Sequence, residues 1–338
     1  MKKQETGDRK NTVILQSNRK LWIDGLRALA MLFVIFGHQA SGHTGYFVFT
    51  SPIKIPLVFM VTGYVFNDKR ASVRDFFRNL WLKLIIPWLC LTLPFHLIRI
   101  PFKGMRALVE LPYRMLSGEI AWYMPCCIVA EIIWFFIRKY ARKESSTCLG
   151  ALIVFALGIV AGYLNILNFA MINRAMLMQL FILSGYLYRL HEKHFMRLSW
   201  VPVVALIAAY IAMGLISLRI WPSKNLDVHL NKYYNLPYCF AMMILGCFTL
   251  FILANKAGSA PRVLSFIGQN TLVYYLLHAY NIKACVLVMT LLNIHLPGFI
   301  VDACVKTFIA CVACGIEAIL INRYLPEIVG KKRIHTTA

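Results

Sequence analysis

Three ionisable side chains lie within one apolar stretch, LWIDGLRALAMLFVIFGHQ, which covers residues 21–39. They are Asp24, Arg27 and His38, and an ionisable group inside a membrane segment is costly and therefore usually functional. In a helix, the step from Arg27 to His38 returns to the same face within roughly 20° and advances about 16 Å. Asp24 lies one turn before Arg27 and can pair with it. This spacing predicts one wall of an active site.

The two basic side chains of this stretch suit different tasks. A guanidinium such as that of Arg27 binds phosphate through two parallel hydrogen bonds. The imidazole of His38 titrates near neutral pH, so it can act as a general base, for example on a sugar hydroxyl that attacks a thioester. We therefore expect Arg27 to bind a phosphate-bearing ligand and His38 to take part in the reaction.

A second polar stripe lies in the stretch IGQNTLVYYLLHAY. Asn270, Tyr274 and His278 recur every four residues, so they share one helix face. A polar stripe on an apolar helix faces protein or water rather than lipid. Membrane histidines also serve as hydrogen-bonding groups in helix packing, so His278 has two readings. We predict that it joins His38 at a catalytic site.

Polar residues near a further apolar run complete the candidates. Trp122 and Tyr123 precede Pro125, and Glu131 lies within the run. The aromatic pair fits an interfacial belt, whereas Glu131 needs a partner or a cavity. We predict a substrate cavity whose lining includes Asp24, Trp122, Tyr123, Glu131, Asn270 and Tyr274.

The composition indicates whether these residues lie in a membrane or in water. The 338 residues are 59% hydrophobic and the mean hydropathy is +0.65, which indicates an integral membrane protein. The net charge of +22 is scattered between apolar runs, so it predicts positive-inside loops rather than nucleic-acid binding. The ten cysteines form no disulfide framework, and the Cys311–Cys314 pair fits helix packing. No metal site is expected.

The sequence predicts an all-α polytopic membrane protein with about ten transmembrane helices. The predicted spans start near residues 21, 53, 82, 120, 148, 175, 201, 236, 266 and 299. Basic residues concentrate in the gaps on the side of the N-terminus, and Lys54 is assigned to the opposite side. Both termini are therefore predicted to be cytoplasmic, in a cell (inner or plasma) membrane. We expect a tail over 1–20, one membrane domain over 21–325 and a second tail over 326–338.

This orientation places Arg27 near the cytosol and His38 deeper in the membrane. The phosphate ligand of Arg27 should therefore come from the cytosol. Coenzyme A fits, because it is rich in phosphate and carries its thioester on a long flexible arm. The basic residues Arg74, Arg78 and Lys83 lie on the same predicted side and are further candidates for binding its phosphates.

The chain contains a weak internal echo. Residues 59–66 read FMVTGYVF and residues 181–188 read FILSGYLY. Small residues such as Gly63 and Gly185 allow close helix packing. Alternatively, the two segments form equivalent walls of a central cavity.

Four stretches together resemble the acyltransferase family 3 membrane O-acyltransferases, particularly the fucose 4-O-acetylase-like branch. They are DGLR through GH at 24–38, IPLVF with TGY at 55–64, the basic loop that leads into a proline helix start at 78–87, and IGQNT with a histidine at 267–278. The resemblance implies acetyl transfer from acetyl-CoA to a hydroxyl of a surface glycan or its lipid-linked precursor. It also implies essential roles for His38 and Arg27.

One departure from this family concerns the acceptor. Many relatives have a histidine before the proline of the second span, where this chain has Lys54 and Ile55. Direct transfer and a covalent acyl-histidine relay both remain open. A transporter or flippase of glycan or lipid precursors is the main alternative, and a structural membrane subunit is a third. The oligomeric state is not predicted.

Overall fold

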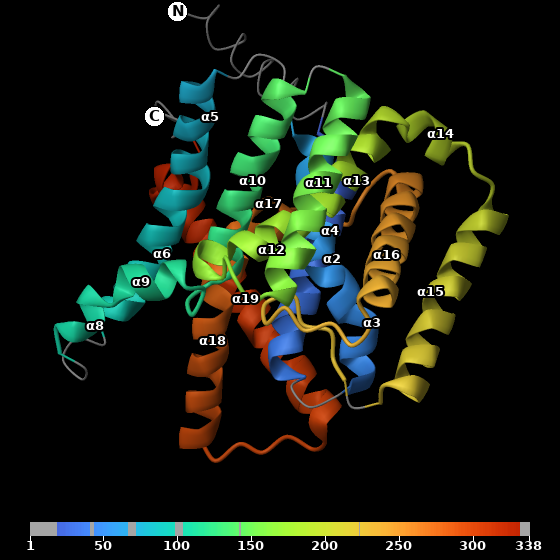
Figure 1. The fold of residues 1–338 in the computed structure, drawn as a ribbon. Coiled ribbons are helices and arrows are strands. Elements are labelled where there is room, and N and C mark those ends of the chain that lie inside the picture. Colours follow the sequence, from blue (N-terminus) through green and yellow to red (C-terminus); the bar gives the residue numbers. More distant parts are fainter. Residues whose placement is uncertain are drawn as a thin grey trace, which may run out of the picture.

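The computed structural model describes residues 19–40, 44–66, 72–98, 104–141, 143–222 and 224–331. Within them the chain is helical, apart from connections and one isolated bridge between Asp227 and Lys232 (Figure 1). The predicted tails fall largely outside the described residues. The helices are α2 (Leu21–Gln39), α3 (Thr44–Lys54), α4 (Pro56–Val65), α5 (Val73–Leu80), a π-helix (Trp81–Ile85), α6 (Ile86–Leu97), α8 (Arg106–Val109), α9 (Leu111–Leu116), α10 (Tyr123–Tyr140), α11 (Glu144–Tyr163), a 3-10 turn (Phe169–Met171), α12 (Ile172–Leu177), α13 (Gln179–Leu190), α14 (Glu192–Met196), α15 (Trp200–Ile220), α16 (Leu236–Ala257), α17 (Arg262–Gln269), α18 (Thr271–Leu291), α19 (Phe299–Tyr324) and a 3-10 turn (Pro326–Val329).

The predicted all-α polytopic membrane fold is confirmed. In the described part of the chain, eight helical segments are long and apolar enough to cross a membrane, and up to nine if the bent α12–α13 pair is one span. The sequence predicts about ten. The difference is α10, which is helical but is not among these segments. Glu131, Arg138 and Lys139 lower its hydropathy, and most of its charge gathers at one end.

The outer helices expose apolar side chains as lipid-facing helices do. Only 17% of the apolar window is buried in α15 and in α19, against 72% in the segment Gly45–Val65. Val201 on α15 and Ile300 on α19 are 78% and 70% exposed. Figure 1 shows α15 at the edge of the bundle, with α2 and α4 near its middle. Contiguous apolar surface of this kind is stable in hydrocarbon.

The internal echo forms a close backbone contact between α4 and α13. A Cβ added to Gly63 on α4 would lie 1.8 Å from the Ile182 carbonyl oxygen, and one added to Gly185 on α13 would lie 1.8 Å from that of Met60. The contact is reciprocal, because the backbone of each helix packs directly against the glycine of the other. Neither glycine lines the cavity described below. The echo therefore serves helix packing rather than cavity walls.

The second span is broken at Ile55. Pro56 occupies the start of α4, where its missing N–H and fixed φ are tolerated, and α3 ends just before it at Lys54. Lys54 was predicted to lie in a loop on the far side. That prediction is wrong, because α3 and α4 together form the membrane-length segment Gly45–Val65 and Lys54 lies within it. Two prolines and one lysine conceal this span in the sequence.

A second break separates α17 from α18 at Asn270. Its amide donates to the Phe266 carbonyl (2.8 Å), and its Oδ1 accepts hydrogen bonds from Asn322 (2.8 Å) and Lys331 (2.9 Å). Asn270 thus joins the end of α19 to the start of α18, at the same end of the bundle as the start of α2. Burial, with the charge of Arg19, lowers the pKa of Lys331. The predicted stripe is therefore split between this junction and the body of α18.

Candidate active site

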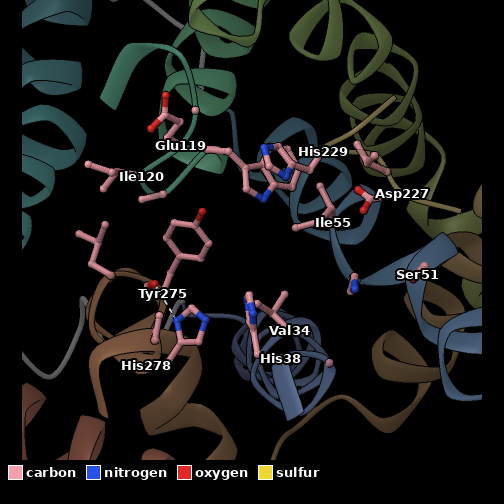
Figure 2. Close-up of a pocket in the computed structure, with 18 of the residues that line it drawn as sticks. Val34, His38, Ser51, Ile55, Glu119, Ile120, Asp227, His229, Tyr275 and His278 are labelled. Atoms are coloured by element: carbon pink, nitrogen blue, oxygen red, sulfur yellow. Dashed lines mark hydrogen bonds between the residues drawn. The ribbon is translucent and has the colours of Figure 1, made fainter. Parts of the chain in front are cut away.

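A cavity of about 600 Å³ lies at the end of α2 that carries His38. Its walls come from α2, α3, the segment 114–122, the loop 225–229 and α18, together with Thr92 and His96 of α6. Figure 2 shows His38 and His278 side by side near Tyr275, across the cavity from His229 and Asp227. A cavity of this volume is typical of sites for small molecules.

The two histidines face each other with their ring centroids 5.0 Å apart. His38 is exposed to the cavity, whereas His278 is 3% exposed. The Nδ1 of His278 lies 3.0 Å and 2.8 Å from the carbonyl oxygens of Tyr274 and Tyr275. Because carbonyl oxygens only accept, Nδ1 must carry a proton. In the neutral ring Nε2 then holds a lone pair, and it has no hydrogen-bond partner among the described residues.

Aromatic side chains form the wall next to this pair. The Tyr123 backbone N–H donates to the Tyr275 hydroxyl (3.1 Å), and the two rings lie 5.1 Å apart. Trp122 stacks on His229 with 5.0 Å between centroids and 17° between planes. The Arg174 guanidinium donates to the His229 carbonyl (3.1 Å), and burial lowers the pKa of the His229 imidazole. The cavity therefore presents flat aromatic surface beside imidazole acceptors.

The segment before α10 reaches the cavity through unusual backbone. Ala121 has φ of 50°, which is costly for a residue with a Cβ, and it lines the cavity. Gly118 has φ of 81°, and a Cβ there would lie 2.0 Å from the Met171 side chain. Strained backbone of this kind persists where packing holds it and concentrates at functional sites. Here it turns the chain so that Trp122 faces the cavity.

Arg27 lies near the other end of α2, beside the buried carboxylate of Asp24. Asp24 is 2% exposed and its main partner is Arg19, which donates from Nε (2.7 Å) and Nη2 (2.8 Å) to its two oxygens. This hydrogen bonding raises the pKa of Arg19. Arg27 Nη1 lies 4.0 Å from Asp24, and Gln269 completes the group at 3.4 Å. The bidentate pair with Arg19 leaves the Arg27 guanidinium only weakly engaged by Asp24.

A carboxylate on α10 lies in the electrostatic field of Arg27 and of a lysine in the π-helix. Glu131 lies within electrostatic range of both Arg27 and Lys83, and its Oε1 is 3.8 Å from the Cys127 thiol. Arg74 and Arg78 lie on the exposed face of α5. The structure thus groups Arg27, Glu131 and Lys83, with two further arginines on the preceding helix.

The predicted site residues divide into two sets. His38, His278 and Trp122 line the cavity. The remaining residues lie outside its lining: Asp24, Arg27, Arg74, Arg78, Lys83, Tyr123, Glu131, Asn270 and Tyr274. Tyr123 lies directly behind the wall, since it contacts Tyr275 and is also within electrostatic range of Arg27. Tyr274 is buried, with its hydroxyl close to Gly315 of α19.

Several polar cavity residues were not among the predicted site residues. They include Ser51, Lys54, His96, Asp227, His229 and Lys283. Lys54 is a charged residue among apolar neighbours, which can indicate a site residue, but the charge pattern of the sequence places it in a loop. The loop 225–229 carries no periodicity that places it over α2. In the described part of the chain, no group of three or more His, Cys, Asp or Glu side chains is arranged to hold a metal ion.

The comparisons with known proteins agree with this architecture. A family model described as an acyltransferase domain, acyltransferase family 3, matches residues 20–316. No curated protein and no solved structure matches the chain. The matched range begins just before α2 and ends within α19, so it contains every residue that lines the cavity. The chain belongs to the acyltransferase family 3 and is a multi-pass membrane acyltransferase.

Proposed function

We propose that this acyltransferase moves an acetyl group from cytosolic acetyl-CoA to a hydroxyl of a cell-surface polysaccharide or its lipid-linked precursor. Its place is the cell membrane, and within the family it fits the fucose 4-O-acetylase-like branch. One observation carries the proposal: His38 and His278 meet in a cavity at one end of α2, while Arg27 lies near the other end of that helix.

The donor binds from the side of Arg27. This guanidinium and the Lys83 ammonium bind the coenzyme A phosphates, with Arg74 and Arg78 of α5 as outer contacts. The helical rise from Arg27 to His38 is about 16 Å. A flexible arm that passes Tyr123 and Tyr275 therefore brings the thioester to the two histidines.

The acceptor hydroxyl reacts beside His38. Its oxygen forms a bond to the acetyl carbon, the carbon–sulfur bond breaks, and the hydroxyl proton passes to His38. Sulfur leaves as a thiolate and takes up that proton as coenzyme A departs. The Nε2 lone pair of His278 supplies a second acceptor beside His38, because its Nδ1 is committed to two carbonyls. That lone pair orients and stabilises the protonated form of His38.

A covalent variant of this step places the acetyl group on His38 before the sugar attacks. Purified protein with radiolabelled acetyl-CoA and no acceptor separates the two routes. Label that remains on the protein and is lost in His38→Ala supports the relay. Absence of trapped label, with transfer intact when acceptor is added, supports direct attack.

The decisive experiment compares membranes that contain wild-type protein, His38→Ala or His295→Ala, normalised for the amount of protein. Labelled acetyl-CoA is supplied and glycan acetylation is read by mass spectrometry. His38→Ala should lose roughly 10²- to 10⁴-fold in rate, as expected for removal of a general base. His295 lies in the connection between α18 and α19 outside the cavity lining, so its variant should match the wild type. Equal rates in all three would remove His38 from the mechanism.

The same experiment tests the alternative of a transporter or flippase. A transporter changes the side on which a glycan precursor appears without adding mass to it. Wild-type membranes that translocate the precursor but never acetylate it would overturn the acetyltransferase proposal. A structural subunit would show neither activity, and His38→Ala would leave every phenotype unchanged.

A further inference from the structure

Lys54 is a charged side chain inside a membrane-length helical segment. It is the last residue of α3 and lies near the middle of Gly45–Val65, where it is half-buried. Its ammonium lies 5.1 Å from the centre of the Phe47 ring and forms no ion pair with any residue that the structure describes. An unpaired cation at such a position is costly, so it indicates a function.

The Lys54 ammonium is directed to the cavity end of α2. A Cβ added to Gly37 would lie 3.5 Å from its Nζ, and both residues line the cavity. The break at Ile55 ends α3 at this level and leaves the lysine at the cavity wall. Lys54 is thus adjacent to the turn of α2 that carries His38, and its charge acts on that imidazole.

A second lysine reaches the same cavity from another helix. Lys283 lies on α18, five residues beyond His278, and is exposed. Its charge also acts on His38, and it forms no ion pair within the described ranges. Two cations from separate helices therefore flank the proposed reaction centre without a protein counter-ion.

The remaining charges in the cavity do not neutralise these lysines. Arg114 and Glu119 pair with each other at 2.8 Å. Asp227 acts on Lys54 only from beyond ion-pair distance, and its Oδ1 accepts a hydrogen bond from the Leu230 backbone (3.1 Å). The cavity lining thus carries three Lys or Arg side chains and two carboxylates, and the unpaired cations lie on the His38 side.

We propose that the acceptor carries a negatively charged group close to the hydroxyl that is acylated, and that Lys54 binds this group with Lys283 as the second cation. This inference rests on the proposed acetyl transfer to a saccharide and specifies its acceptor. The chemistry shared by the candidate groups is a cluster of anionic oxygens. It is supplied by the carboxylate of an acidic sugar or by the phosphate of a lipid-linked precursor, and both accept charge-assisted hydrogen bonds from an ammonium.

The test measures binding by the purified full-length protein in nanodiscs, without any need for turnover. The probes are methyl β-D-glucuronide, methyl β-D-glucoside and glucose 1-phosphate, which represent a carboxylate, a neutral sugar and a phosphate. The wild type should bind a charged probe roughly ten- to a hundredfold more tightly than the glucoside, as expected for one charge-assisted contact. A preference for glucuronide identifies an acidic sugar, and a preference for glucose 1-phosphate identifies the phosphate source.

Three variants locate the effect. Lys54→Met should abolish the preference for the charged probe, while Lys54→Arg should retain most of it. Lys232→Met is the matched control, because Lys232 is exposed, lies close in sequence to the cavity-lining loop 225–229 and does not itself line the cavity. Melting temperatures of the variants within a few degrees of the wild type show that the fold is intact. If Lys54→Met fails to fold, Lys54→Arg is the folded Lys54 variant that is compared with the wild type.

The outcomes separate this inference from the proposed function. Any of three results overturns the role of Lys54. They are equal binding of charged and neutral probes by the wild type, no binding of either charged probe at millimolar concentration, and a preference for the charged probe that survives in Lys54→Met. Acetyl transfer to cell glycans is measured on the same preparations. A lysine-dependent preference without acetyl transfer refutes the acetyltransferase and supports an anionic ligand. Acetyl transfer without the preference supports the acetyltransferase and refutes the anionic ligand.

Discussion

Replacement of Gly63 by alanine tests the packing of α4 against α13. A Cβ there would lie 1.8 Å from the Ile182 carbonyl oxygen and 2.6 Å from its carbonyl carbon. Since a carbon–oxygen contact normally needs about 3.3 Å, the two helices must move apart by about 1.5 Å. The obstacle is backbone, so no side-chain rotation relieves it. The surrounding side chains, including Phe59 and Phe181, are fully buried and would lose contacts on both helices.

Two opposing effects decide how much Gly63→Ala changes the free energy of unfolding. Alanine is favoured over glycine in a helix interior by about 1 kcal/mol. Forced overpacking costs about 1–3 kcal/mol, and more when backbone must shift. We expect overpacking to prevail in Gly63→Ala, with a net loss of about 2 kcal/mol in the free energy of unfolding. Gly45→Ala is the matched control, because Gly45 is a helical glycine with nothing within 4 Å of its added Cβ.

The assay is thermal unfolding of detergent-purified protein, followed by size-exclusion chromatography with fluorescence detection. Gly63→Ala should melt below the wild type, and Gly45→Ala should melt at or above it. Gly185→Ala meets the Met60 carbonyl oxygen at the same 1.8 Å, so its loss should be similar. The double variant should cost less than the sum, because the first separation of the helices relieves the second clash. Gly63→Ala that melts at or above the wild type would refute the reciprocal glycine contact.

Two further predictions concern the cavity. His278→Phe keeps an aromatic ring but removes the Nε2 lone pair, so acetyl transfer should fall roughly a hundredfold while coenzyme A binding, measured by titration, is unchanged; a fully active variant would contradict the role of His278. Burial lowers the pKa of His229, so the fold favours the neutral ring. This stabilisation is complete above the unfolded-state pKa of about 6.5 and is lost as the pH falls through the lowered value. Melting temperatures between neutral pH and pH about 5 should therefore decline more steeply in the wild type than in His229→Phe, and parallel curves would contradict the argument.

Local patterns predicted the helices well. Each of the ten predicted spans corresponds to a helix or a broken helix pair, because apolar runs of membrane length leave the backbone few alternatives to helix. The placement of Arg27 and His38 on one helix follows from the same local rule. Their common helix needs no partner from elsewhere in the chain.

The ion pairs and the cavity depended on contacts between distant segments. The predicted pair of Asp24 with Arg27 forms at 4.0 Å, but Arg19 folds back from before the helix and binds both carboxylate oxygens more closely. Helical spacing cannot reveal such a partner, since Arg19 precedes the first turn of α2. Because α3 and α4 form one segment that is broken at Ile55, Lys54 lies within a membrane-length segment and not in the predicted loop.

The sequence by itself determined the membrane environment and the helices, because the insertion of each segment depends mainly on its own hydropathy and on the charges that flank it. It also identified His38 and His278 as candidates without showing that they meet. Only the tertiary structure decided that α2 and α18 bring the two rings to 5.0 Å, and that Lys54 and the loop 225–229 close around them. The reason is physical: helix formation is governed by neighbours along the chain, whereas a cavity is formed by the packing of helices whose order in the bundle no local period encodes.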